Sequence, residues 1–158
     1  MLLRIETLPE KKLIGMSMAM SFTDIKTPLL WRSFRPRLNE IKNSIGADLY
    51  SAEVYPPGYY NAFNPANPFA KWAAIEVSGF DNIPQEMQTL LFEGLYAVFL
   101  HKGPASQGVN TYNYIFLNWL PTSGYVLDDR PHFAIMGPKY LNEDPASEEE
   151  IWIPVKAR

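Results

Sequence analysis

The hydrophobic pattern of this chain predicts one order of secondary structure twice, and that repeat restricts the fold more than any other feature of the sequence. In the first half, three segments alternate apolar residues with small or polar ones, a period of two that is typical of β-strands. These segments are 11–22, 47–55 and 71–78. A helical pattern lies between the first two: it opens at Thr27-Pro28, contains Pro36 and stops at Gly46. Its apolar face is Trp31, Phe34, Leu38, Ile41 and Ile45.

The second half is predicted to follow the same order. Its strands are 94–103, 132–136 and 150–155, with a short strand at 123–127 and a helical turn at 85–91. A helix opens at Pro104 and ends at Pro121. Its apolar face is Val109, Tyr112, Ile115, Phe116 and Trp119. Phe22 and His101, which end the two corresponding first strands, are 79 residues apart, half of the 158 in the chain.

We therefore expect one domain over residues 1–158, built from two βαββ repeats of about 1–79 and 80–158. The predicted fold class is α+β, an antiparallel sheet with pseudo-two-fold symmetry. The helices should cover one face of the sheet and leave a central cleft on the other, where the halves meet. Such junctions are common ligand sites.

Charge and composition exclude several kinds of function. Lys and Arg total 14 and Asp and Glu total 17, and a net charge of −3 argues against direct nucleic-acid binding. The absence of cysteine excludes a disulfide scaffold, a zinc–thiolate site and a cysteine nucleophile. No dinucleotide, phosphate-loop or HExxH motif is present and there are only two histidines, so we predict neither a cofactor nor a metal site. Because no signal peptide or membrane-spanning apolar run is present, we expect a cytoplasmic protein without a membrane segment.

Aromatic residues make up 14% of the chain, which indicates either a large core or an aromatic-lined cavity. Alternation along the last strand places Glu150 and Trp152 on one face and Ile151 and Ile153 on the other. If the aliphatic face packs on the helices, Glu150 and Trp152 point into the cleft. A carboxylate beside an indole ring suits a cationic amphipathic ligand. The alternative is a solvent-facing Glu150 beside a half-buried Trp152.

Two other carboxylates share a strand face with an aromatic residue. Glu53 does so with Tyr55 on the second strand, and Glu76 does so with Trp72 on the third. We rank both as secondary candidates for the same role.

Four segments resemble the GyrI-like small-molecule-binding family, also known as the effector-binding domain of AraC- and MerR-type regulators. They are FAKWA (69–73), GLYAVFLHKG (94–103), DDRPHFAIMGPKY (128–140) and SEEEIWIPV (147–155). The closing strand after the RPxF segment is the most specific of them. The resemblance runs over essentially the whole chain. It implies the duplicated βαββ fold and a cleft that binds hydrophobic, frequently cationic compounds.

The resemblance also implies which residues bind the ligand. The family's cleft acid on the last strand falls on Glu150, and its neighbouring aromatic residue falls on Trp152. The aromatic wall falls on Tyr96, Trp72, Tyr55 and Trp119. Relatives often carry Glu after the Phe of the RPxF segment, where this chain has Ala134, and that departure argues against catalysis.

Three functions stand as alternatives. The first is a binding module without a DNA-reading unit, which captures a small hydrophobic or cationic compound for sensing or sequestration. The second is a hydrolase of reactive electrophilic natural products, as in some relatives, with Glu150 as general base and Tyr96 or Tyr140 as proton donor. The third is an interaction with a protein partner, which the family's founding gyrase inhibitor suggests. Product formation distinguishes the hydrolase from the binding module.

Overall fold

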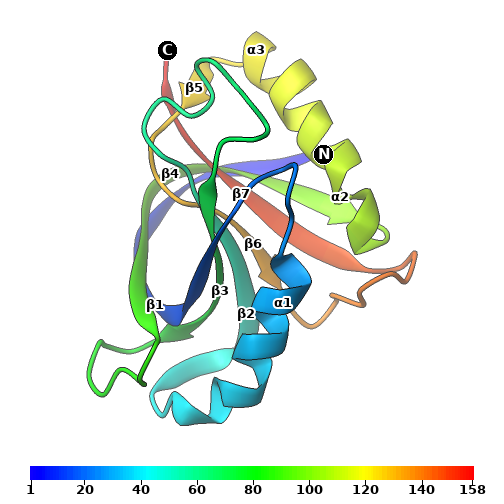
Figure 1. Cartoon of the computed structure of the whole chain (residues 1–158). Coiled ribbons are helices and arrows are strands. Elements are labelled where there is room, and N and C mark those ends of the chain that lie inside the picture. The colour runs from blue at the N-terminus through cyan, green and yellow to red at the C-terminus, as the bar shows by residue number, and fades with distance from the viewer.

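The computed structural model describes all of residues 1–158, and most elements fall where the sequence pattern predicts them, although several strands are longer. Figure 1 shows α1 and the α2–α3 segment on the outer side of a strongly curved sheet. In chain order the elements are β1 (Leu2–Met20), α1 (Thr27–Phe34), η1 (Arg35–Glu40), β2 (Ser44–Val54), β3 (Phe69–Val77), β4 (Gln88–Lys102), η2 (Ala105–Gln107), α2 (Gly108–Asn113), η3 (Tyr114–Trp119), α3 (Leu120–Thr122), β5 (Tyr125–Leu127), β6 (His132–Met136) and β7 (Glu148–Ala157).

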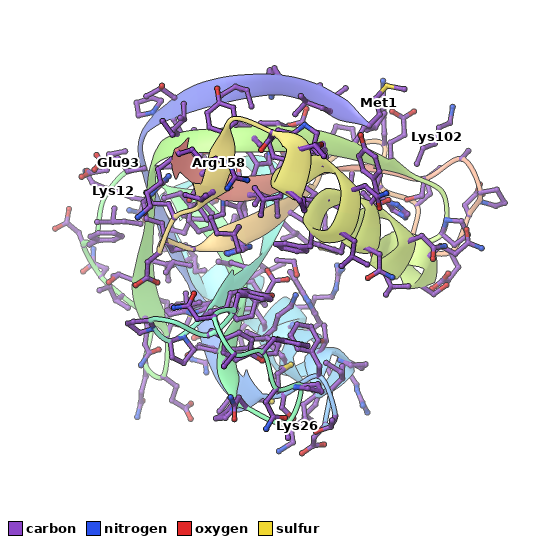
Figure 2. The ribbon with its side chains drawn as sticks, turned by 90° about the horizontal axis from the view of Figure 1, so that it is seen from above. Met1, Lys12, Lys26, Glu93, Lys102 and Arg158 are labelled. Atoms are coloured by element: carbon purple, nitrogen blue, oxygen red, sulfur yellow. The ribbon has the colours of Figure 1, made fainter.

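The seven strands form one antiparallel sheet in the order β4-β1-β3-β2-β6-β7-β5. β4 also pairs with β7, over Tyr96–Lys102 and Glu148–Pro154, and this pairing closes six of the strands into a ring. β5 is attached to the last part of β7. In the view from above, Met1 and Lys102 lie close together (Figure 2), because β1 begins beside the end of β4 and the Met1 carbonyl accepts a hydrogen bond from the Leu100 amide at 3.0 Å.

Both halves of the chain pair their strands in the same order. In the first half β1 pairs with β3 and β3 with β2, and in the second half β4 pairs with β7 and β7 with β6. The halves join through equivalent strands, β1 to β4 and β2 to β6. Two βαββ repeats predict this pattern, while the duplication itself stays a prediction.

The first helix is shorter than the sequence pattern predicted. α1 ends at Phe34, and Pro36 lies in the 3-10 turn η1, because proline has no N–H to continue an α-helix. The predicted extension to Gly46 is wrong, since Ile45 and Gly46 belong to β2. Gly46 has a φ of +71° at the irregular start of that strand, where its pairing with β3 shifts in register. Ile45 is exposed, so its spacing from Ile41 reflects no packing on a helix face.

Two expectations for the second half are also corrected. The segment predicted as a helical turn over 85–91 is mostly the beginning of β4, which starts at Gln88. The second helix continues past Pro121 to Thr122 and includes a π-helical stretch over Tyr114–Trp119. Val109 is exposed, so the buried face of this helix begins later than predicted.

Side chains of the chain itself fill the inner face of the ring, where we expected an open cleft. Phe92 and Phe133 stack there with centroids 4.0 Å apart, and Phe133 stacks on Trp152 at 5.2 Å. The pairing of β4 with β7 explains this, because a small closed barrel leaves an interior that side chains fill. The inner core is Leu8, Leu13, Tyr50, Ala52, Trp72, Ala74, Phe92, Tyr96, Val98, Phe133 and Trp152.

The helices pack on the outer face, as predicted. α1 buries Leu30 and Phe34 against a cluster that includes Ile14. The second helical segment buries Ile115 in a cluster with Ile151. None of the helices is long and apolar enough to span a membrane.

Candidate functional site

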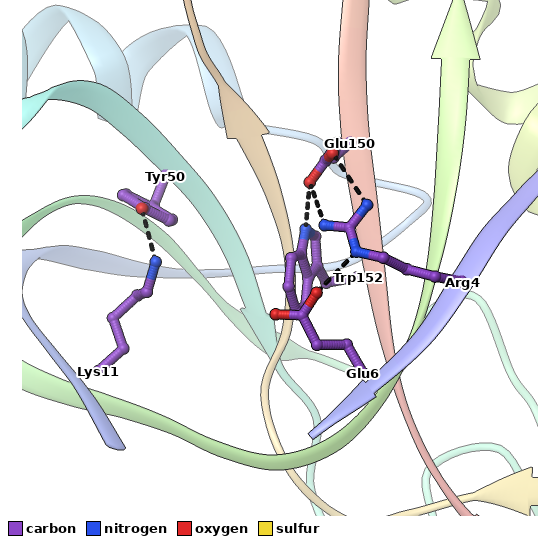
Figure 3. A network of polar contacts seen from close by, with 6 residues as sticks. All are labelled: Arg4, Glu6, Lys11, Tyr50, Glu150 and Trp152. Carbon is purple, nitrogen blue, oxygen red and sulfur yellow. Dashed lines mark hydrogen bonds and ion pairs between the residues drawn. The ribbon is translucent and has the colours of Figure 1, made fainter. Parts of the chain in front are cut away.

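A cation of the chain itself occupies the position that was predicted for a ligand cation. Arg4 on β1 places its guanidinium carbon 5.4 Å from the centroid of the Trp152 ring (Figure 3). Its two terminal nitrogens lie 3.3 and 3.4 Å from the two oxygens of Glu150, and its Nε donates to Glu6 at 2.6 Å. Trp152 Nε1 also donates to Glu150 Oε1, at 3.1 Å. Both oxygens of Glu150 therefore already have donors.

Three aromatic residues predicted to line the cleft are core residues of the ring. Tyr96, Trp152 and Trp72 expose only 0%, 4% and 8% of their surface. The Tyr96 hydroxyl donates to the carbonyl of Pro131 at 2.8 Å, and burial raises the pKa of this hydroxyl. The proton that Tyr96 was predicted to donate in catalysis is thus engaged inside the core.

Glu150 borders an open cavity of about 540 Å³ between the starts of β1 and β7 and the end of β6. Its apolar walls are Leu3, Leu100 and Ile135. Its charged residues are Asp48, Lys139, Glu148, Glu149 and Glu150. This cavity contains the predicted acid, but that acid is paired.

A second group of polar and aromatic side chains gathers on the outer face of the sheet. It forms because the inner face of β2 takes Tyr50 and Ala52, so alternation turns Glu53 and Tyr55 outward. The other members come from β3, β6, β7, the β2–β3 loop and the second helix. We name this group the Glu53 cluster; its members are Glu53, Tyr55, Tyr60, Lys71, Tyr112, Phe116, His132 and Glu149.

Tyr60, from the β2–β3 loop, links the aromatic rings of the Glu53 cluster. It stacks on Phe116 of the second helix with centroids 5.4 Å apart and meets Tyr55 edge-on at 4.9 Å. Tyr55 also meets His132 edge-on, at 4.9 Å. Tyr55, Tyr60 and His132 form part of the wall of a cavity of about 230 Å³, so one side of the cluster is open to a small space.

An ion pair between neighbouring strands supplies the charge of the cluster. Lys71 stands opposite Glu53 in the β2–β3 register and donates to Glu53 Oε1 at 3.0 Å. Each side chain is only 13% exposed. The other oxygen, Oε2, is buried and accepts no hydrogen bond. An unpaired ionised oxygen away from water is costly, so this oxygen is an acceptor that a ligand can satisfy.

Glu149 adds a second carboxylate, because it alternates with Glu150 along β7 and so faces outward. Burial raises the pKa of Glu149, and the negative charge of Glu53 adds to that effect, while His101 and Lys71 oppose it. Burial likewise raises the pKa of Tyr112, and the charges of Glu53 and Glu149 both contribute. The two carboxylates therefore act on the same hydroxyl group.

Two imidazole rings lie in or beside the cluster: His132 is a member of it, and His101 stands opposite Glu149 in the β4–β7 register. Burial, and then the positive charge of Arg130, lower the pKa of His132 to about 3, so this ring is neutral near neutral pH. Arg130 itself pairs with Asp128 at 2.8 Å and donates to three backbone carbonyls. His101 contacts the carbonyl of Pro104 at 2.9 Å through Nε2 and the hydroxyl of Thr111 at 2.7 Å through Nδ1. No group of three or more His, Asp or Glu side chains is arranged to hold a metal ion.

The sequence profile of the GyrI-like small molecule binding domain matches residues 1–156. This chain belongs to the GyrI-like family. The GyrI-like domain is a small-molecule-binding domain, and members of this family are related to effector-binding domains of transcription regulators.

Solved structures share the GyrI-like fold seen here. SAV2435 bound to tetraphenylphosphonium has a TM-score of 0.69 at 13% identity, covering 97% of this chain and 93% of that one. The EcmrR C-terminal domain has a TM-score of 0.69 at 17% identity, covering 98% and 97%. A hydrolase from Listeria innocua has a TM-score of 0.60 at 13% identity, covering 97% and 91%. At these identities the likeness shows the fold alone. No curated protein sequence matches the chain.

The remaining predicted residues of this GyrI-like domain lie outside the Glu53 cluster. Trp119 packs the second helix on the sheet, edge-on to Phe99 at 5.0 Å and stacked with Tyr125 at 6.2 Å. Ala134 is buried in the outer core. Burial raises the pKa of Tyr140, and the charge of Glu149 adds to it.

Sequence reasoning found part of the Glu53 cluster. Tyr55 was predicted as a wall residue, and Glu53 was a secondary candidate that shares its face. Glu149 was not singled out, although alternation along β7 turns it to the face opposite Glu150. Lys71 was missed because its position opposite Glu53 depends on the register between two strands.

Proposed function

We propose that this GyrI-like domain binds a hydrophobic organic cation at the Glu53 cluster. The observation that carries the proposal is the buried, unpaired Oε2 of Glu53. It lies in a cluster that also contains Tyr55, Tyr60 and Phe116. Aromatic faces attract cations, and a carboxylate in the same place neutralises the charge that such a ligand brings out of water.

The alternative site at Glu150 remains a prediction from the family resemblance. There, Arg4 already provides the cation over Trp152 and fills both oxygens of Glu150. A ligand would have to displace this arginine, whereas at the Glu53 cluster one carboxylate oxygen has no partner but is covered by the protein, so a ligand reaches it only when a neighbouring side chain moves. The tetraphenylphosphonium in SAV2435 supports the chemical class of ligand, not the choice between the two sites.

The size of the cavity beside the cluster sets a condition for binding. Its volume of about 230 Å³ is below the roughly 300–1,000 Å³ of sites for drug-sized ligands. Tyr60 is an aromatic wall residue that a ligand can move, because it comes from the β2–β3 loop and not from a strand. We propose that uptake of a bulky cation turns Tyr60 away from Phe116.

Calorimetric titration with tetraphenylphosphonium tests this function. We expect saturable binding to the native chain, at least about tenfold weaker binding to Glu53→Gln, and a change of less than about twofold for Glu150→Gln. The neutral triphenylphosphine oxide should bind weakly to all three proteins. A loss confined to Glu150→Gln would move the site to the cavity at Glu150, and no saturable binding to the native chain would overturn the proposal.

Mass spectrometry of an electrophile incubated with the protein tests the hydrolase alternative, since only turnover gives a new product.

A further inference from the structure

We infer that Lys71 sets the charge of the ligand that the Glu53 cluster accepts, by cancelling one of its two carboxylates. This inference rests on the proposed function of the cluster. It concerns the choice between ligands that carry one positive charge and ligands that carry two. A site that binds cations could prefer either.

The positions of the charges support this role. Glu53 and Glu149 are the carboxylates of the cluster, and Lys71 is its only ammonium group. Lys71 occupies Oε1 of Glu53 and leaves Oε2 free. His132 is neutral, so Glu53, Glu149 and Lys71 together carry an excess of one negative charge when both carboxylates are ionised, with His101 opposite Glu149 just outside the cluster. That excess matches one positive charge on a ligand.

The backbone holds Lys71 in this position. It lies near the start of β3, opposite Glu53 on one side and opposite Met18 of β1 on the other. Pairing on both edges fixes the backbone at Lys71, and the ion pair of its ammonium group with Glu53, at 3.0 Å, keeps the charge at the site. A dication would bring a second positive charge against Lys71 in a poorly solvated place, where repulsion is weakly screened.

Two ligands of similar size and shape separate charge from contact area. N-methyl-4-phenylpyridinium carries one positive charge, and methyl viologen carries two on a similar biaryl frame. We define the selectivity as the dissociation constant of the dication divided by that of the monocation, measured at one mildly alkaline pH, because the raised pKa of Glu149 makes its ionisation more complete as the pH rises. The native chain should prefer the monocation, with a selectivity above one.

Replacing Lys71 changes the charge of the cluster without changing the aromatic walls. Lys71→Met leaves two uncompensated carboxylates, so we expect the selectivity to fall about tenfold or more in favour of the dication. Glu53→Gln combined with Lys71→Met restores an excess of one negative charge, and its selectivity should return to the native value. Urea unfolding checks that each variant is folded.

Lys71→Arg provides a second test, in which the folded protein does not have to tolerate a buried carboxylate without a partner. The guanidinium fork can donate to both oxygens of Glu53 while the net charge stays the same. We expect both ligands to bind about tenfold more weakly, with unchanged selectivity.

Each outcome bears on one claim. If the native chain binds neither ligand, the proposed function fails. If it binds the monocation in a manner that depends on Glu53, but the selectivity of Lys71→Met equals the native value, the role of Lys71 is overturned and the site stands. If Lys71→Met is unfolded, a changed selectivity of Lys71→Arg, in which the net charge is the same, overturns the same role.

Discussion

The guanidinium carbon of Arg4 lies 5.4 Å from the ring centroid of Trp152, although the two residues are near opposite ends of the chain. The same arginine contacts Glu150, which in turn accepts the indole N–H. Arg4 thus makes, within the protein, the interactions that Glu150 and Trp152 were predicted to make with a ligand. The closure of the ring brings the start of β1 beside β4, which pairs with β7.

Arg4→Met should therefore lower stability and leave binding at the Glu53 cluster unchanged. We expect a loss of about 1 kcal/mol, because a partly exposed ion pair contributes about 0–1 kcal/mol and a cation–π contact about 0.5–1 kcal/mol. Urea unfolding of Arg4→Met, Glu150→Gln and the double variant forms a double-mutant cycle. It should give an interaction free energy between Arg4 and Glu150 of about 0.5–1 kcal/mol. Lys12→Met is the matched control, since Lys12 has only an exposed pair with Glu10, at 3.8 Å. A coupling of zero would show that the contact contributes no stability.

Phe133→Ala should be among the most destabilising substitutions in the inner core. Phe133 is buried between Phe92 and Trp152, so its removal leaves a cavity that the closed ring cannot collapse to fill. We expect a loss of about 3–5 kcal/mol in the free energy of unfolding, measured by urea titration. Leu117→Ala is the control, because Leu117 is 72% exposed on the second helix and should change stability by less than about 0.5 kcal/mol. Equal effects of the two would contradict the packed interior.

Gly15→Ala should disrupt the pairing of β1 with β3. A Cβ atom at Gly15 would lie 2.1 Å from the carbonyl oxygen of Ala73 and 2.7 Å from Ala74, and both are parts of the neighbouring strand that cannot rotate away. We expect loss of the cooperative unfolding transition or a large fall in its midpoint, measured by circular dichroism. Gly108→Ala meets nothing within 4 Å and lies at the start of α2, so it should be neutral or stabilise by up to about 1 kcal/mol.

His132 should make stability depend on pH in a mildly acidic range. Its pKa falls from 6.5 to about 3 on folding, because it is buried and faces Arg130. Below pH 6.5, the pKa of His132 in the unfolded chain, the unfolded chain binds a proton that the folded chain does not bind. The stability that is present above pH 6.5 is therefore lost as the pH falls toward 3. The slope should approach about 1.4 kcal/mol per pH unit.

Urea unfolding of the native chain and of His132→Phe at about pH 7 and about pH 5 measures this contribution. The variant keeps a ring against Tyr55 and Tyr60, and its stability should fall less over this interval. The raised pKa of Glu149 acts in the opposite sense, because a carboxyl with a raised folded-state pKa lowers stability as the pH rises above 4.5, so it does not mimic the effect. Identical pH dependence of the two proteins would show that the pKa of His132 does not fall on folding.

Much of the secondary structure could be predicted from the sequence, because alternation of apolar residues depends only on near neighbours. The alternation placed Glu150 with Trp152 and Glu53 with Tyr55, and the structure keeps both pairs on shared faces. The prediction failed where a local pattern had two interpretations. Ile45 follows Ile41 at helical spacing, yet Pro36 had already ended the α-helix and Ile45 belongs to β2.

The order of the elements and the side chains that share a face of each strand follow from the residues alone, since a strand has a period of two wherever it lies. Which of those faces became the interior depended on how distant strands pair. Pairing of β4 with β7 closed the ring, buried Tyr96 and Trp152, and brought Arg4 to Glu150. The register of β2 against β3 set Lys71 opposite Glu53 and left one buried oxygen unpaired. Such long-range pairings depend on the free energy of the whole sheet, so no local pattern in the sequence contains them.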